Sequence, residues 1–206
     1  MHRLRRFVFL LGGVLIPRLN CVIQRMGAGD ALDSVRLHQL IHQLTLGQLS
    51  LNTFCKELAI MSPDTDINWE NDLVLRMTHN EAMQPILDTL AGKFELVLLS
   101  DYPVTWCNNI LDGSSFAGYC SQIVHTAHEG PHDTYVSLFE YLIENEVMKP
   151  GRTVLVDWHS QRTSAAINAG LDAAIFIDAA RFYRDLGLWG IVPLLDINTI
   201  RTNGWA

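Results

Sequence analysis

The sequence predicts a doubly wound α/β fold built on a parallel sheet, and two observations indicate it. Residues 7–16 form an apolar run with a Gly pair, which is typical of a buried central strand that ends in a tight turn. From residue 81 onwards, short apolar runs alternate with helical patterns, as in a parallel sheet with crossover helices. We expect further strands at 94–100, 122–125, 153–157 and 173–177, and helices at 81–91, 104–111, 134–145 and 160–169.

The composition limits the class of protein. The chain has 206 residues, of which 49% are hydrophobic and 18% charged, enough for one sizeable core plus an insertion. A net charge of −7, with no basic cluster beyond residue 6, argues against a nucleic-acid partner. The four cysteines are widely spaced, which favours reduced thiols and a cytoplasmic protein.

The basic N-terminus before the apolar run imitates a secretory signal. However, residues 17–21 contain no pair of small residues for cleavage, and ten apolar residues are too few to span a bilayer, which takes about 20. We therefore expect the run to be retained as a strand, and we expect no membrane partner.

Helical patterns follow the first apolar run. Leucines recur at helical spacing over residues 30–46, and the pattern ends at Gly47. Ser50 is placed to cap a second helix that continues to Leu58.

Polar residues end two of the expected strands, at Ser100 with Asp101 and at Asp157 with His159. Ligands of open parallel sheets bind beyond the carboxyl ends of the strands. We therefore expect these four residues to lie together near the turn after the first strand and to form a ligand-binding site.

The first run resembles the opening motif of the haloacid dehalogenase-like (HAD) hydrolases, a strand of the form VFDLDGVL. In that motif the first Asp is the nucleophile and the second is the acid/base. Here Leu10 stands at the nucleophile's position and Gly12 at that of the acid/base, while residues 13–15 match. The resemblance also implies that residues 17–80 form a helical cap and that residues 1–16 and 81–206 form the core.

Three further stretches resemble the remaining HAD motifs. Ser100 matches the Ser or Thr of the second motif, and Asp101 stands where Asn is common. In the third, Gly130 replaces the Lys ahead of Pro. In the fourth, Asp157 matches the first acidic residue, whereas Trp158 replaces the second, and Arg162 stands where Asn is usual.

These replacements predict a protein without phosphatase or dehalogenase activity. A leucine cannot attack a substrate or bind a cation, and a glycine cannot donate a proton. No Asp or Glu occurs in residues 1–29, so we expect the magnesium site to be lost and no cofactor to be bound. We expect the crevice to be filled by side chains, Trp158 among them, and the fold to serve protein binding, ligand binding or assembly, including a homo-oligomer.

A histidine-rich segment leaves an alternative open. A working hydrolase could use a transition metal, because His and carboxylate suit zinc or iron. Its ligands would be His125, His128, His132, Asp157 and His159. His38 and His42, four residues apart on one helix face, could also hold a metal, although polar surface residues are the simpler interpretation.

Overall fold

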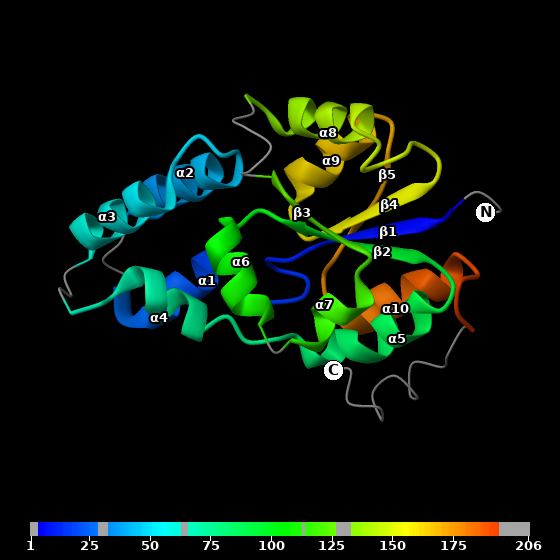
Figure 1. Ribbon diagram of the computed structural model, residues 1–206, viewed down its shortest axis with the longest axis horizontal. Coiled ribbons are helices and arrows are strands. Elements are labelled where there is room, and N and C mark those ends of the chain that lie inside the picture. The colour runs from blue at the N-terminus through cyan, green and yellow to red at the C-terminus, as the bar shows by residue number, and fades with distance from the viewer. Residues whose placement is uncertain (1–3, 29–32, 63–65, 113, 127–132, 194–206) are drawn as a thin grey trace.

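The computed structural model describes residues 4–28, 33–62, 66–112, 114–126 and 133–193. Five parallel strands form one sheet in the order β3-β2-β1-β4-β5 (Figure 1). This confirms the predicted α/β fold with a parallel sheet and the first apolar run at its centre. The strands are β1 (Arg6–Leu10), β2 (Glu95–Ser100), β3 (Gln122–His125), β4 (Thr153–Asp157) and β5 (Asp172–Ile175).

Strand β1 is apolar along its length because both of its neighbours and both faces of the sheet bury it. Phe7 pairs with Leu96 of β2 on one side and with Val154 of β4 on the other. The side chains of residues 7–10 are at most 1% exposed. A strand covered on both faces needs a continuous apolar run, and this is the pattern in the sequence.

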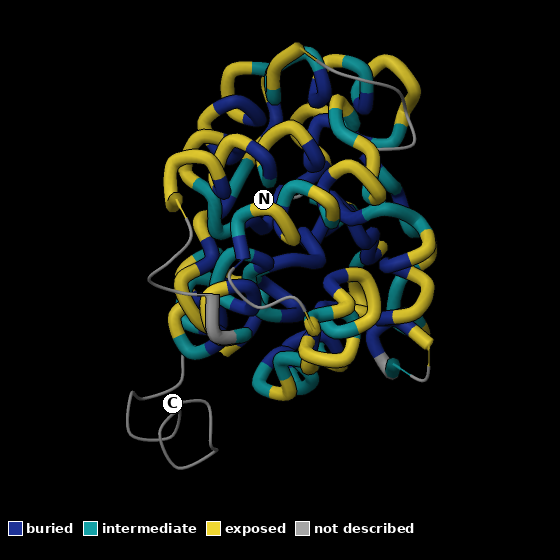
Figure 2. Tube along the Cα trace, turned by 90° about the vertical axis from the view of Figure 1, so that its left-hand side faces the viewer, coloured by how far each residue is buried: buried dark blue, intermediate teal, exposed yellow. Residues whose placement is uncertain are grey.

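Helices cover the two faces of the sheet (Figure 1). Helices α8 (Tyr135–Glu144) and α9 (Ser160–Asn168) lie on one face, and α5 (Gln84–Ala91) and α10 (Ala179–Leu188) on the other. On the second face Phe182 packs edge-on against Phe9, with ring centroids 6.0 Å apart. The buried residues gather between these layers (Figure 2).

The segment after β1 is helical and lies beyond the carboxyl ends of the strands (Figure 1). Asp33 caps α2 and Ser50 caps α3, since their side-chain oxygens accept backbone N–H groups of the first turn. Asn80 closes the segment where the chain returns: its N–H donates to the Leu15 carbonyl at 2.8 Å and its side-chain amide to the Val14 carbonyl at 2.9 Å. The elements are α1 (Leu19–Ile23), a π-helix η1 (Gln24–Ala28), α2 (Ser34–Thr45), α3 (Leu51–Met61), α4 (Trp69–Leu75) and a 3₁₀ turn η2 (Glu81–Met83).

Most expected elements are present, with changes at their ends. The first run leaves the sheet after Leu10, because Gly13 takes a φ of +85° and the chain turns back so that the Gly13 N–H bonds the Ile16 carbonyl at 2.7 Å. Helix α6 (Val104–Leu111) and strands β3 and β4 have the expected bounds. Short elements such as α1, α4 and α7 (Ser115–Tyr119) were not expected. Within the described residues, no helix is long and apolar enough to cross a membrane.

Candidate functional site

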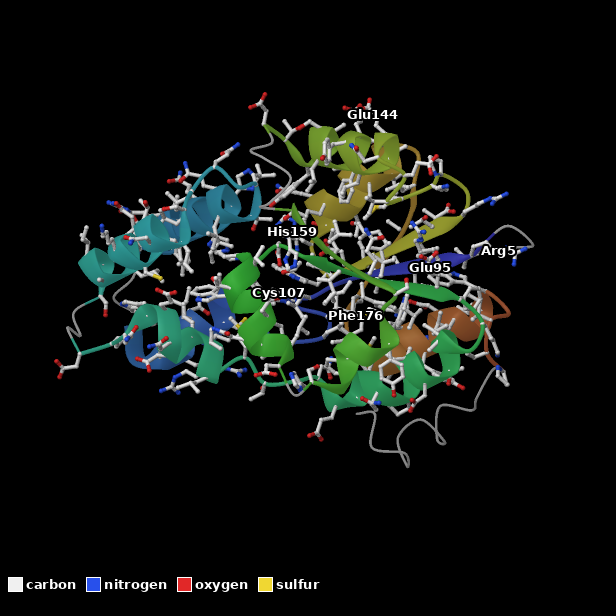
Figure 3. All side chains as sticks on the ribbon, viewed as in Figure 1. Arg5, Glu95, Cys107, Glu144, His159 and Phe176 are labelled. Carbon is white, nitrogen blue, oxygen red and sulfur yellow. The ribbon has the colours of Figure 1, made fainter. Side chains whose placement is uncertain are left out.

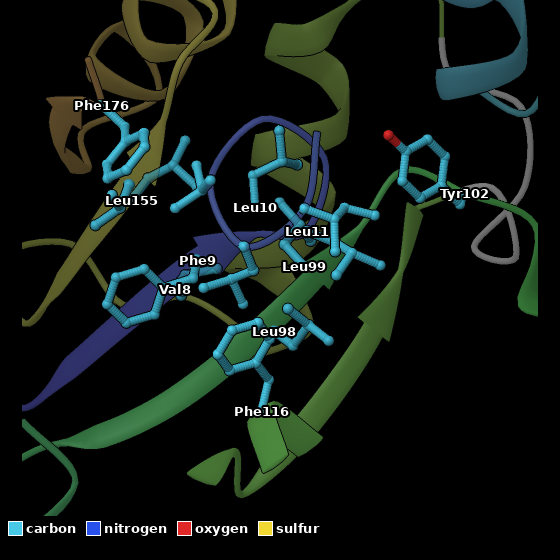
Figure 4. Packing of buried hydrophobic residues seen from close by; sticks show 14 of the residues in the cluster. Val8, Phe9, Leu10, Leu11, Leu98, Leu99, Tyr102, Phe116, Leu155 and Phe176 are labelled. Carbon is cyan, nitrogen blue, oxygen red and sulfur yellow. The ribbon is translucent and has the colours of Figure 1, made fainter. Parts of the chain in front are cut away.

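The turn after β1 carries an apolar residue at its start. Leu10 is 1% exposed and pairs in register with Leu99 of β2. Leu10, Leu11 and Leu99 lie side by side in the core (Figure 4). The side chain at this position therefore belongs to the hydrophobic core and offers no polar atom to a ligand.

Aromatic side chains occupy the space beside the two glycines that follow. A Cβ atom added to Gly12 would lie 2.9 Å from Cζ of Tyr102 and closer still to its hydroxyl. A Cβ atom on Gly13 would lie 2.7 Å from Cγ of Trp158, and its positive φ also disfavours a side chain. Tyr102 and Trp158 thus fill the space around the glycines, as the sequence predicted for Trp158.

Ser100 holds Tyr102 in this position. Its hydroxyl accepts the Tyr102 N–H at 3.2 Å and lies 3.4 Å from the Tyr102 carbonyl, to which it donates. Ser100 is fully buried and does not line the cavity described below. Asp157 is likewise fully buried and does not line the cavity, whereas Asp101 and His159 line it. Of the four expected strand-end residues, Asp101, Asp157 and His159 are joined through the contacts described next, and Ser100 directly precedes Asp101 in the chain.

Arg162 joins the two carboxylates at the strand ends. Its Nε and Nη2 donate to the two oxygens of Asp157 at 2.7 and 3.1 Å, and its Nη1 donates to Oδ2 of Asp101 at 2.9 Å. The His159 N–H donates to Oδ1 of Asp157 at 2.8 Å. Arg162 is 4% exposed and Asp157 is fully buried, so this is a buried, bidentate ion-pair cluster.

Burial and neighbouring charges shift the pKa values of Arg162 and Asp101 in this cluster. Burial by itself lowers the pKa of Arg162, but the carboxylates of Asp157 and Asp101 outweigh it and raise that pKa. Burial raises the pKa of Asp101 above its usual value, against the opposing effect of Arg162. Oδ1 of Asp101 is buried without a hydrogen-bond partner among the described residues. The buried position of Asp101 therefore disfavours its charged form.

The donor set does not fit a magnesium ion. Mg²⁺ requires oxygen ligands in near-octahedral geometry. Both oxygens of Asp157 already accept donors from Arg162 and His159, and positions 10 and 12 bring no carboxylate. The positive charge beside Asp157 is the guanidinium of Arg162.

The histidine-rich alternative can be built only in part. His128, His132 and Gly130 lie outside the described residues. His125 ends β3 and His159 follows β4. In the part of the chain that the structure describes, no three His, Cys, Asp or Glu side chains lie close enough to hold a metal ion.

A cavity of about 300 Å³ remains between α2 and the strand ends, so the side chains expected to fill the crevice do so beside the two glycines but not in all of it. His42 of α2 and Tyr135 of α8 meet at it, with Nδ1 and the phenol oxygen 2.9 Å apart. His159 lies at the same end of the sheet (Figure 3). The lining residues are Gly12, Arg18, Leu19, Asn20, His38, Gln39, Ile41, His42, Leu44, Thr45, Asp101, Tyr102, Tyr135, Trp158, His159, Gln161 and Arg162.

Arg18 and His159 also line the cavity, and their side chains take no part in the ion-pair cluster. The guanidinium carbon of Arg18 lies 4.1 Å from the centroid of the Trp158 ring. Burial lowers the pKa of His159, and the nearby charge of Arg162 lowers it further. Sequence reasoning missed Arg18 and Tyr135, because their place depends on how the helices pack and no motif marks them.

Solved structures with the same arrangement of elements identify the fold. A predicted HAD-like family hydrolase from Porphyromonas gingivalis superposes with a TM-score of 0.59 at 20% identity, over 84% of this chain and 91% of that one. The chain has the HAD-like fold. L-2-haloacid dehalogenase from Xanthobacter autotrophicus, solved with chloropropionic acid covalently bound, gives a TM-score of 0.63 at 15% identity, over 93% and 85%.

A third structure with this fold was solved with ligands bound. It is a HAD family enzyme from Bacteroides thetaiotaomicron in complex with magnesium and inorganic phosphate, with a TM-score of 0.61 at 15% identity, over 84% of this chain and 93% of that one. No family model and no curated protein matches the sequence. At these identities the similarity establishes the HAD-like fold, and the activity has to be argued from the site itself.

Proposed function

We propose that the protein binds a small ligand between the helical segment 17–80, acting as a cap, and the α/β core, without the hydrolase chemistry of HAD enzymes. The observation that carries this proposal is the pairing of Arg162 with Asp157 beside an open cavity of about 300 Å³. Arg162 donates to both oxygens of Asp157, the carboxylate that matches the HAD fourth motif. The cavity beside this pair leaves room for a ligand.

The loss of catalysis follows from three positions. Leu10 has no lone pair with which to attack phosphorus or carbon. Gly12 cannot protonate a leaving group, and the hydroxyl of Tyr102 beside it is buried with its pKa raised, first by that burial. Removing one catalytic group commonly costs several kcal/mol of transition-state stabilisation, and a nucleophile is not replaced by its neighbours.

Arg162 takes the place of a metal ion in this proposal. One guanidinium supplies a positive charge to two buried carboxylates and matches the planar geometry of Asp157 with two donors. A magnesium ion would have to displace these bonds and would find no other carboxylate on the turn after β1. We therefore propose that the protein needs no metal cofactor.

Ligand binding is favoured over assembly because the cavity is open. Its volume lies at the lower end of the range of small-molecule pockets, about 300 to 1,000 Å³. Its walls come from the helical segment and from the core, as in a site closed by a cap.

The four cysteines are free, which fits the expected reducing, cytoplasmic environment.

Turnover and metal content test this proposal. Purified protein is assayed with phenyl phosphate and with 2-chloropropionate, with and without millimolar magnesium, and its metal content is measured. We expect no turnover above the buffer rate and no effect of magnesium. Magnesium-dependent turnover that disappears in Asp157→Asn would overturn the proposal, because it would show a working HAD site.

A further inference from the structure

We infer that the ligand is a small organic oxyanion whose charged group pairs with Arg18 and whose apolar part lies against Tyr102, Tyr135 and Trp158. This inference rests on the proposed ligand-binding function and names its ligand class. It depends on the charges that line the cavity, on the walls between them and on the cavity's size.

Arg18 is the lining cation that lacks a counter-ion. Arg162 is neutralised by Asp157 and Asp101, whereas Arg18 forms no ion pair within the described residues. Its contact with the Trp158 ring holds the guanidinium in place without neutralising it. Because such a contact uses the flat face of the guanidinium, the N–H groups along its edge remain available to a carboxylate or phosphate.

The other lining groups do not compete for this charge. Asp101 is the one carboxylate among the described lining residues, and its Oδ2 already accepts Arg162. His159 has a lowered pKa, chiefly through burial, and its Nδ1 has no hydrogen-bond partner among the described residues. This nitrogen is buried, and a ligand that reaches it would supply the hydrogen-bond partner that it lacks.

The walls suit a compact apolar body. The core contributes the aromatic residues Tyr102, Tyr135 and Trp158 to the lining, and α2 contributes Ile41 and Leu44. A volume of about 300 Å³ accommodates a ligand of about the size of one substituted ring. The combination of one free guanidinium and apolar walls favours a monocyclic carboxylate or phosphate over a sugar or a polycation.

Three probes on the same ring separate charge from shape: benzoate, phenyl phosphate and benzamide. Binding is measured by calorimetry and by the shift in melting temperature. We expect benzoate and phenyl phosphate to bind at least about tenfold more tightly than neutral benzamide. Whichever of the two anions binds more tightly shows whether the site prefers a carboxylate or a phosphate.

Variants then assign the preference to Arg18. Arg18→Gln should weaken both anions at least about tenfold and leave benzamide unchanged. Arg25→Gln is the matched control, since Arg25 is also without an ion pair in the described chain but does not line this cavity. Ile41→Trp, which fills the cavity from α2, should abolish the binding of all three probes while the protein keeps its circular dichroism spectrum.

The outcomes keep the two proposals apart. Equal binding of the three probes, or anion binding that survives Arg18→Gln, overturns the oxyanion inference and leaves ligand binding intact. The absence of binding by every probe at millimolar concentration also overturns the inference. Hydrolysis of phenyl phosphate overturns the proposed function instead. If Arg18→Gln does not fold, the comparison of benzoate with benzamide on the wild-type protein still decides the inference.

Discussion

At the scale of single residues, removing Arg162 should have a large effect on stability. Arg162→Ala leaves Asp157, which is fully buried, without its counter-ion. Breaking a buried ion pair by removing one partner typically costs about 3–5 kcal/mol, so the free energy of unfolding should fall by about that amount. Denaturant melts measure it.

A surface arginine is the control for Arg162. Arg36 pairs with Glu57 and its side chain is 50% exposed, so Arg36→Ala should cost less than about 1 kcal/mol. Adding Asp157→Asn to Arg162→Ala removes the orphaned charge and should recover part of the stability. Equal losses for the two alanine variants would contradict the role given to Arg162.

Asp101 makes stability depend on pH. Its pKa is raised in the folded protein, first by burial, so the folded state holds the proton more tightly than the unfolded state. The stability that this residue contributes is therefore complete below its ordinary pKa of 3.8 and is lost as the pH rises through the raised value.

Asp101→Asn removes this dependence. The amide oxygen of Asn can still accept Arg162, while the buried charge is gone. The difference in unfolding free energy between the variant and the wild type should shift in favour of the variant as the pH rises from about 4. Melts across this range measure the shift, and a difference that stays constant with pH would refute it.

At the scale of elements, the contact between His42 and Tyr135 ties α2 to α8 across 93 residues of sequence. The rings also meet edge to face, with centroids 5.0 Å apart. His42→Ala should loosen α2 with little loss of global stability, because His42 is exposed and the core is untouched. Hydrogen exchange of the α2 amides should speed up relative to those of α3.

His38→Ala is the matched control for His42. Its Nδ1 lies 2.7 Å from the Ser34 carbonyl, so its contact stays within α2. Exchange in α2 should change less in this variant than in His42→Ala. If both variants change α2 alike, the link to α8 does not hold the helix.

The elements that the sequence predicted are those with long apolar patterns or clear caps. Strands β1 and β4, helix α6 and the Ser50 cap of α3 could be predicted because each depends on local residues. The position of Asp101 and Asp157 at the ends of parallel strands was likewise enough to predict that they lie together. The bridge that Arg162 forms, and the approach of Arg18 to Trp158, depend on tertiary packing, and spacing in the sequence carries no signal of either.

At the scale of the whole molecule, the core of the HAD-like fold forms here with Leu10 and Gly12 at the positions where the HAD motif has aspartates. Leu10 packs with the central sheet, and Arg162 pairs with the buried charge of Asp157. A site without crowded carboxylates has no like-charge repulsion to overcome, so our proposal of a non-catalytic protein predicts that adding carboxylates there lowers stability.

Placing aspartates at positions 10 and 12 should therefore destabilise the protein. Leu10→Asp with Gly12→Asp buries new carboxylates and forces Tyr102 away from position 12, so the protein should lose about 2–4 kcal/mol without magnesium. Magnesium should restore little of this loss, because Arg162 still holds Asp157. Adding Arg162→Asn frees that carboxylate, so magnesium should then raise the melting temperature more than in the double variant. An equal response to magnesium in the two variants would show that Arg162 does not occupy the place of the metal.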